Sequence, residues 1–187
     1  KDNIQKIVML TPFEESLPDN TLDLKGKTLV FQDCYLNSGV YKDGVNAIIK
    51  NGVIDATGAS YDAMAIAHGG SGFRFENVEF KGGEALDSYV LVNGGSLWLT
   101  NCRFGPTKVA PVSIQQSNNS YSPGIRIESC TFDGAGKPGY AVSYNTNGEL
   151  LAINNIITGF QGNTSSGPSA GFLIPYGRTA TLEGNKI

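Results

Sequence analysis

One short pattern recurs along the chain and constrains its fold more than any other feature. In the stretch Ser96–Gly105, apolar and polar residues alternate until Asn101, where the alternation breaks and restarts one step out of phase. Alternation is typical of β-strands, because successive side chains point to opposite faces. Asparagine tolerates the left-handed backbone of a sharp bend. The stretch therefore predicts two short strands that meet at Asn101.

The pattern returns at a spacing of roughly 25 residues, which lies in the range typical of solenoids. The predicted bend residues are Asp33, Asn51, Asn77, Asn101, Ser129, Asn155 and, in a degenerate last copy, Gly184. Strands that repeat without intervening helices stack in parallel, so that like residues lie over like residues. The expected inward columns are Phe31, Ile49, Phe75, Leu99, Ile127 and Ile153, and Leu36, Ile54, Phe80, Phe104 and Phe132.

The sequence thus predicts an all-β protein, a right-handed parallel β-helix of about seven coils over residues 21–187. In the first coil, Leu22–Leu24 is the expected first strand, and Lys27–Leu36 contains the second strand, the bend and the third strand. Residues 1–20 lie outside the repeat and form a separate N-terminal cap. Apolar residues at helical spacing in Asn3–Leu10, followed by Pro12, favour a short capping helix there.

Composition narrows the classes of partner. The net charge is −3, which does not suggest a nucleic-acid surface, and no apolar run is long enough to insert into a membrane. Cys34, Cys102 and Cys130 each follow a predicted bend residue and lack the spacing of metal ligands. We therefore expect them to be small buried residues, and we expect no metal and no cofactor.

The repeats also resemble a known family. The form IxIxNCxFxG, seen in Leu97–Gly105 and approximately in Ile125–Gly134, is similar to the coils of right-handed parallel β-helix proteins with the pectate-lyase-like fold. The opening segment Leu17–Phe31 resembles the start of the β-helix in bacteriophage tailspike and depolymerase chains. This resemblance implies a homotrimer in a virion tail or outside the cell, with bacterial surface polysaccharide and other virion or flanking domains as partners. A glycine- and aspartate-rich segment usual in that family is missing, and the chain stops within a coil. We therefore expect a piece of a longer protein, or ends covered by partners.

Outward positions are the place to look for function, since inward ones are committed to packing. On the second strands the outward column contains Arg74, Trp98 and Arg126, which we expect on adjacent coils with Trp98 between two guanidinium groups. An exposed indole stacks on a sugar face, and arginine binds carboxylates or hydroxyls. These three are the candidate polysaccharide-binding residues. The alternative is a cation–π ladder flanked by surface ion pairs with Glu76 and Glu128.

Further charged residues fit simpler interpretations. On the third strands, Glu79 and Arg103 are expected to form a cross-strand pair. His68, the only histidine, is followed by glycine as in polygalacturonases, but the other motifs of that family are absent and we reject that reading.

Cleavage of a glycosidic bond requires two carboxyl groups roughly 5–9 Å apart. Glu84 and Asp87, in the variable loop Lys81–Ser88, are the catalytic candidates. The alternative is that they are ordinary loop carboxylates, as Asp55, Asp62 and Asp133 are. No acidic column suited to a calcium-dependent lyase is present in the sequence.

Three functional hypotheses follow. The first is a virion-associated, tailspike-like chain that recognises bacterial surface polysaccharide, with degradation of that polysaccharide left open. The second is a non-catalytic structural shaft of a tail appendage or surface adhesin. The third is a free polysaccharide lyase or glycoside hydrolase. The sequence leaves the choice between binding and catalysis open.

Overall fold

In the computed structural model, the described residues are 6–9, 21–31, 35–37, 46–59, 62–68, 72–115, 124–161, 171–175 and 178–187. They form a parallel β-solenoid of about five turns, with no helix in this part of the chain. The seven coils expected from the repeats are not confirmed. Within the same residues, no helix is long and apolar enough to cross a bilayer.

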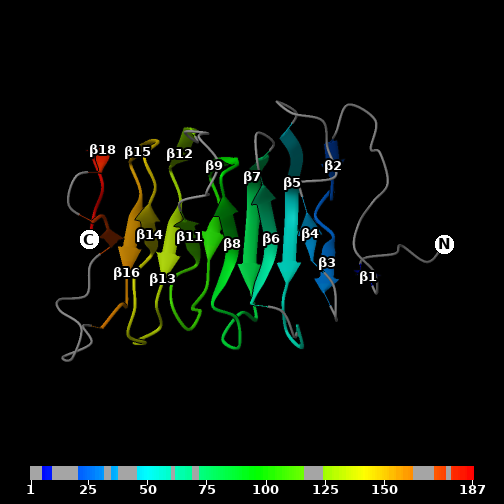
Figure 1. Cartoon of the computed structure of the whole chain (residues 1–187). Helices are drawn as coiled ribbons and strands as arrows, with labels where there is room; N and C mark the ends of the chain where they lie inside the picture. The colour runs from blue at the N-terminus through cyan, green and yellow to red at the C-terminus, as the bar shows by residue number, and fades with distance from the viewer. Residues whose placement is uncertain are drawn as a thin grey trace.

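The strands fall into two parallel sheets that run the length of the stack (Figure 1). The larger sheet holds the strands on either side of each bend: β1 (Lys6–Met9), β2 (Thr21–Asp23), β3 (Thr28–Phe31), β5 (Asn46–Asp55), β7 (Gly72–Lys81), β9 (Ser96–Thr100), β10 (Arg103–Phe104), β12 (Gly124–Glu128), β13 (Thr131–Asp133), β15 (Glu149–Ile153), β16 (Ile156–Thr158) and β18 (Thr179–Glu183). The smaller sheet holds the first strand of each coil: β4 (Leu36–Asn37), β6 (Ala63–His68), β8 (Ser88–Asn93), β11 (Val112–Gln115), β14 (Val142–Asn145) and β17 (Phe172–Leu173).

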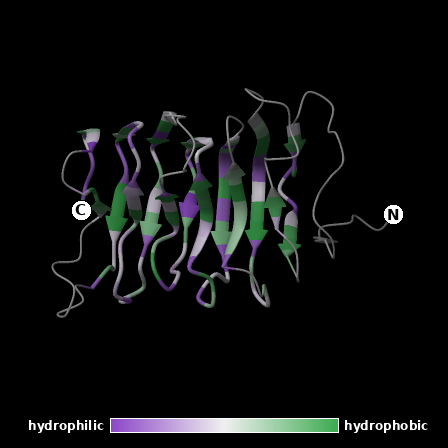
Figure 2. Cartoon of the chain, viewed as in Figure 1, coloured by the Kyte–Doolittle hydropathy of each residue, from purple (hydrophilic) through white to green (hydrophobic). Residues whose placement is uncertain are grey.

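Hydrophobic and hydrophilic residues alternate along these strands (Figure 2), and the register stacks the inward ones into columns. Phe80, Phe104 and Phe132 lie directly over one another, with ring centroids 4.5 Å and 4.9 Å apart and nearly parallel ring planes. All three are fully buried. Offset-stacked aromatic pairs add about 0.5–1.5 kcal/mol each beyond the burial of their surface, so this column ties the central coils together.

The predicted bends have the backbone that the sequence requires. Asn51, Asn77, Asn101 and Ser129 have φ between 54° and 59°, and Gly184 has a φ of 62°. This left-handed conformation is unfavourable for most residues, and asparagine and glycine tolerate it best. The bend positions are therefore fixed by residue type as well as by stacking. Asp33 and Cys34 lie outside the described residues, and the bend of the first coil lies at Lys25–Gly26, not at Asp33 as predicted.

The first coil is arranged differently from our expectation. Thr21–Asp23 pairs with Ile48–Lys50, and Thr28–Val30 pairs with Val53–Asp55, so β2 and β3 are the second and third strands. Their bend is at Lys25–Gly26, where both residues have positive φ. Leu36 belongs to the smaller sheet and pairs with Ala65, and was wrongly predicted in a third strand.

Close packing around Gly52 accommodates this longer bend. A Cβ at Gly52 would lie 2.5 Å from the Leu24 Cβ and 2.6 Å from the Lys27 carbonyl oxygen. Only glycine leaves room for the two extra residues of the first bend. The sequence pattern shows no sign of this backbone contact, which explains why the parsing of that coil was wrong.

Within the described residues 6–9, the predicted N-terminal helix is also wrong. Lys6–Met9 is the strand β1, which pairs in parallel with Thr28–Phe31. The sheet edge at β3 offers unpaired backbone groups, and a strand satisfies them where a helix cannot. Residues 1–5 and 10–20 of the expected cap lie outside the described residues.

The coil that contains β15 is shifted by one residue from its predicted phase. Its left-handed residue is Asn154, with a φ of 55°, and Asn155 is fully buried on the inner side of the bend. Ala152 pairs with Ile127 in the inward column, whereas Ile153 pairs with Glu128 and is only half-buried. The predictions of Asn155 as the bend residue and Ile153 as an inward residue are therefore wrong.

Candidate functional site

The outer face of the larger sheet carries a column of side chains at the centre of its second strands. The register aligns Arg74 with Trp98, Trp98 with Arg126, Arg126 with Leu151, and Leu151 with Thr181. Adjacent strands lie about 4.8 Å apart, so Trp98 has an arginine on each neighbouring coil. The structure thus brings together the three residues predicted to bind polysaccharide.

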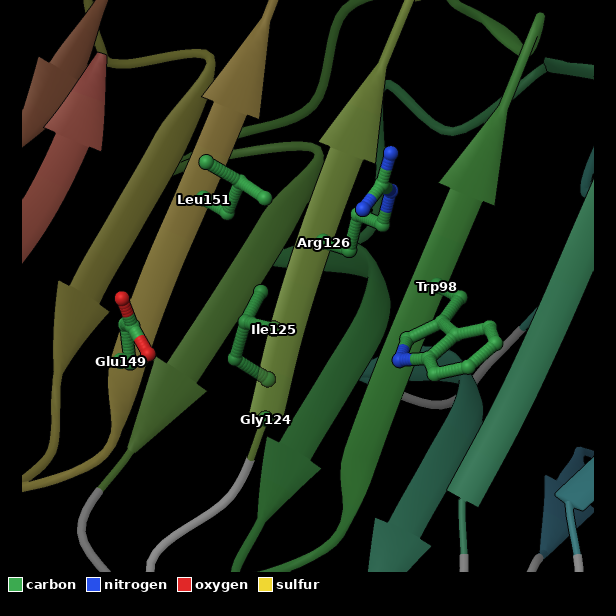
Figure 3. Close-up of a pocket in the computed structure, with 6 residues that line it drawn as sticks. All are labelled: Trp98, Gly124, Ile125, Arg126, Glu149 and Leu151. Carbon is green, nitrogen blue, oxygen red and sulfur yellow. The ribbon is translucent and has the colours of Figure 1, made fainter.

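Trp98 borders a shallow, open depression with a volume of about 220 Å³ (Figure 3). The depression is lined by Trp98, Gly124, Ile125, Arg126, Glu149 and Leu151. Figure 3 shows the side chains of Trp98, Arg126 and Leu151 on three successive strands, with Glu149 on the same strand as Leu151. Trp98 is 41% exposed although its neighbours Leu97 and Leu99 are fully buried. An indole exposed beside a hollow is a surface on which a flat apolar face can stack.

Glycine shapes the floor of this depression. Gly124 is exposed, and a Cβ placed there would meet nothing within 4 Å. In the register of the sheet it is aligned with Glu149 on the next strand. A larger residue at this position would fill the space between Trp98 and Glu149. The absence of a side chain at Gly124 therefore keeps the hollow open.

Both arginines of the column are bound by a glutamate two residues further along the same strand. The Arg126 Nε and Nη2 atoms donate to Glu128 Oε2 at 3.1 and 2.9 Å. Arg74 Nε lies 2.5 Å from Glu76 Oε1. Residues i and i+2 of a strand point to the same face, so the repeated Arg-x-Glu sequence produces the same pair on two coils. These partly exposed pairs orient the guanidinium groups but stabilise the fold little.

The two arginines differ in their relation to Trp98. The Arg74 guanidinium carbon lies 5.4 Å from the centre of the indole ring, within the range of a cation–π contact. In the described part of the chain, this is the only such contact, and Arg126 is instead held on Glu128 at the side of the depression. The expectation that Trp98 lies between two stacked guanidinium groups is therefore only half correct.

Glu84 and Asp87, the predicted catalytic pair, lie elsewhere. They belong to the turn between β7 and β8, and neither lines the depression beside Trp98. This turn is fixed by Tyr89, whose hydroxyl accepts a hydrogen bond of 2.9 Å from the Gly83 backbone N–H. Burial raises the pKa of Tyr89. The Asp87 carbonyl accepts the backbone N–H groups of Val109 and Ala110, so the residue links one loop to the next.

Two of the remaining loop aspartates have structural roles. Asp55 Oδ1 accepts the Thr57 N–H at 2.9 Å, and Asp133 Oδ1 accepts the Ala135 N–H at 2.8 Å. Each is followed by a residue with positive φ, Gly58 or Ala135. An aspartate that bonds the backbone two residues on is typical of a turn. These carboxylates act as turn formers.

Other predicted interactions resolve as follows. Glu79 and Arg103 are neighbours in register, but the ion pairs found among the described residues do not include this one. Cys102 and Cys130 are buried free thiols, as expected.

The side chain of His68 lies outside the described part. No cluster of three or more His, Cys, Asp or Glu side chains that could hold a metal occurs among the described residues.

Sequence reasoning missed four residues of the depression, Gly124, Ile125, Glu149 and Leu151. The one-residue error in the phase of Glu149–Ile153 placed Ala152, and not Leu151, beside Arg126. A shift of one residue moves every side chain of a strand to the other face. The sequence alone carries no signal for this shift. The phase is set by the stacking of the small Ala152 against Ile127, which is visible only in the three-dimensional register.

Comparison with known proteins establishes the fold family. No curated protein and no solved structure matches the chain. A family model described as the right-handed β-helix region matches residues 22–187, almost the whole length. The register and bends described above are what such a solenoid requires. The chain therefore belongs to the right-handed β-helix family.

Proposed function

We propose that this protein is a carbohydrate-binding β-helix that recognises bacterial surface polysaccharide through the depression beside Trp98. The observation that carries the proposal is the position of Trp98. It is the only tryptophan of the chain, it is 41% exposed, and it borders a hollow with charged groups beside it. A pyranose ring has an apolar face for the indole and hydroxyl groups for Arg126 and Glu149.

The biological setting of the proposal comes from the resemblance of the opening segment and repeats to tailspike chains. A tailspike-like protein acts in a virion tail or outside the cell, and it assembles as a homotrimer with other virion or flanking domains. Three copies would present three depressions, and linked sites raise overall affinity without any new contact. This suits a site that is shallow and open.

The proposal concerns binding and not cleavage. Hydrolysis takes two carboxyl groups on either side of the scissile bond. In the described residues, Glu149 is the carboxylate that lines the depression, and Glu84 and Asp87 are in a different part of the fold. A depolymerase or lyase activity would therefore need groups other than these.

Glycan-array binding of the full chain tests the proposal. We expect binding to one or more bacterial capsular or lipopolysaccharide fragments, and a loss of at least about tenfold, or ~1.4 kcal/mol, in Trp98→Ala. Ile156→Ala is the matched control, because Ile156 is a similarly exposed apolar residue of the same sheet outside the depression. Equal binding by the parent chain and Trp98→Ala would refute the site.

A second function, a structural shaft without ligand, is favoured by one observation. Arg74 and Arg126 are each bound by a glutamate of their own strand, so the face is charge-balanced without a ligand. A shaft would show no glycan binding, and Trp98→Ala would leave the assembly of the appendage unchanged. The array experiment separates the two functions.

A further inference from the structure

The charges around Trp98 decide which sugars the depression can hold. Among the described residues, Arg126 is the only basic one that lines it, and two of its N–H groups already donate to Glu128. An acidic sugar that bound Arg126 would place its carboxylate beside that of Glu128. Like charges at such a distance repel, and the repulsion disfavours the wrong ligand.

Glu149 adds a second carboxylate to the same hollow. It is exposed, it comes from the strand next to Arg126, and no ion pair of Glu149 is found within the described residues. The lining therefore holds one guanidinium and one carboxylate, and that guanidinium is already paired with Glu128 outside the lining, so the depression offers no unpaired positive charge. On the far side of Trp98, Arg74 is likewise balanced by Glu76, so no excess positive charge reaches the indole.

A neutral sugar fits this arrangement better than an acidic one. A hydroxyl group can accept from the N–H groups of Arg126 that Glu128 leaves open, and it can donate to Glu149. The indole of Trp98 and the Leu151 side chain supply apolar surface on the same face. The volume of about 220 Å³ is below the ~300–1,000 Å³ of pockets that enclose a drug-sized ligand, so the hollow suits about one ring.

We propose that the depression selects an uncharged pyranose unit and rejects uronic acids, through the pairing of Arg126 with Glu128 and the free carboxylate of Glu149. The proposal rests on the function proposed above and names the chemical class of its ligand. A polysaccharide recognised here presents a neutral residue to Trp98, even where acidic residues occur elsewhere in its repeat unit.

Tryptophan fluorescence gives a direct test, because Trp98 is the only tryptophan in the chain. The full chain is titrated with oligosaccharides of glucose, galactose and mannose, and with the corresponding uronates of equal length. Each pair differs only in the oxidation of the C6 carbon. We expect at least one neutral oligosaccharide to change the emission of Trp98, with an affinity at least tenfold above that of its uronate. Raising the salt concentration from about 50 to about 500 mM screens charge and should change the neutral affinity less than twofold.

Two charge-removing variants sharpen the test. Glu149→Gln keeps the shape of the side chain but removes its charge, and we expect the preference for the neutral sugar to fall at least threefold. Glu79→Gln is the matched control, since Glu79 is an exposed carboxylate of the same sheet outside the depression. An unchanged preference in Glu149→Gln would overturn the role of that carboxylate.

The outcomes separate this inference from the function on which it rests. If uronates bind more tightly than the corresponding neutral oligosaccharides, as measured by the emission of Trp98, and if salt lowers the affinity of the uronates, the site is correct and the inference is wrong. If no oligosaccharide of either set changes the emission and the glycan array is also blank, both are wrong. Neutral binding with weak salt dependence supports both.

Discussion

Exposed side chains join successive coils at the outer edge of the bends, whereas buried side chains join them one residue further along. The outer ladder consists of Asp23, Asn51, Asn77 and Asn101. The Asn51 amide donates to Asp23 Oδ1 at 3.2 Å, Asn77 to Asn51 at 3.0 Å, and Asn101 to Asn77 at 3.4 Å. Asn77 and Asn101 are exposed to solvent.

The inner ladder consists of Cys102, Cys130, Asn155 and Asn185. The Cys102 N–H lies 3.4 Å from the Cys130 sulfur, and the Cys130 N–H donates to Asn155 Oδ1 at 2.8 Å. The Asn155 amide donates to the Ile127 carbonyl at 3.0 Å and to Asn185 Oδ1 at 2.8 Å. Cys102, Cys130 and Asn155 are almost completely buried.

Both ladders link one coil to the next, but they differ in energetics. A solvent-exposed hydrogen bond exchanges with water and contributes little net free energy, whereas a buried donor or acceptor that loses its partner costs about 1–3 kcal/mol. We therefore infer that the inner ladder holds the coils together. At the outer positions, the left-handed backbone and not the hydrogen bond is the reason for asparagine.

The largest expected effect is the loss of Asn155. Asn155→Ala leaves the buried Cys130 N–H without its acceptor and removes an additional donor from the Ile127 carbonyl. We expect the free energy of unfolding to fall by about 2–3 kcal/mol, because a buried donor loses its only side-chain acceptor. Chemical denaturation followed by circular dichroism measures this change.

The neighbouring asparagine is the matched control. Asn154 is exposed at the bend with a φ of 55°. Asn154→Ala should cost only about 1 kcal/mol, the penalty of a left-handed alanine. If the two variants lose equal stability, the distinction between the ladders fails.

Much of this fold could be predicted from sequence, because stacking repeats the same residue type at the same position. The columns Phe80–Phe104–Phe132 and Arg74–Trp98–Arg126 follow from alternation around Asn77, Asn101 and Ser129 alone. The bend residues of these central coils were predicted correctly for the same reason. Where the alternation is unambiguous, it fixes the register.

The coil of Leu150–Ile157 shows where that reasoning ends. Its sequence LLAINNII has apolar residues at every strand position and two adjacent asparagines, so neither the alternation nor the bend residue fixes a phase. Burial decides the matter: Asn155 replaces the cysteine of the previous coils and Asn154 makes the bend. The error in phase also hid Leu151 and Glu149, which line the depression beside Trp98.

A pH dependence tests the thiol part of the inner ladder. A hydrogen bond with the Cys102 thiol and burial raise the pKa of Cys130 above its usual value of 9.0. The folded chain keeps the thiol protonated while the unfolded chain ionises, so the stabilising contribution is complete below pH 9 and declines as the pH rises further. The expected decline is about 1.4 kcal/mol per pH unit, measured by denaturation under reducing conditions.

Cys130→Ser isolates this contribution, because a hydroxyl can accept the Cys102 N–H but does not ionise in this range. In this variant, the free energy of unfolding should decline less between pH 9 and 10. Above pH 10 the free energy of unfolding should still decline, since burial also raises the pKa values of Tyr89 and Tyr144 above their usual 10.0. An identical pH profile in Cys130→Ser would show that the thiol is not the titrating group.

Asn77 tests whether backbone or hydrogen bond determines the outer ladder. Asn77→Ala removes the ladder amide and puts alanine at a φ of 54°, so we expect a loss of about 1 kcal/mol. Asn77→Gly removes the same amide without the backbone penalty and should stay within about 0.5 kcal/mol of the parent chain. Thermal and chemical unfolding compare the pair. Equal losses in the two variants would assign the energy to the hydrogen bonds and contradict the comparison.

The smallest effect is expected at Asp23, the exposed end of the outer ladder. Hydrogen bonds from the Lys25 backbone N–H and from the Asn51 amide lower the pKa of Asp23 below its usual 3.8. The contribution of the Asp23 carboxylate to the stability of the fold is therefore complete above pH 3.8, and it is lost as the pH falls through the lowered pKa of the folded chain. Asp23→Asn keeps an acceptor oxygen for both donors but removes the charge, so its melting temperature should be slightly below that of the parent chain at pH 6. The difference should vanish towards pH 2, where the parent carboxylate is protonated too. A gap between the two melting curves that persists at low pH would mean that shape, and not charge, matters at this end of the ladder.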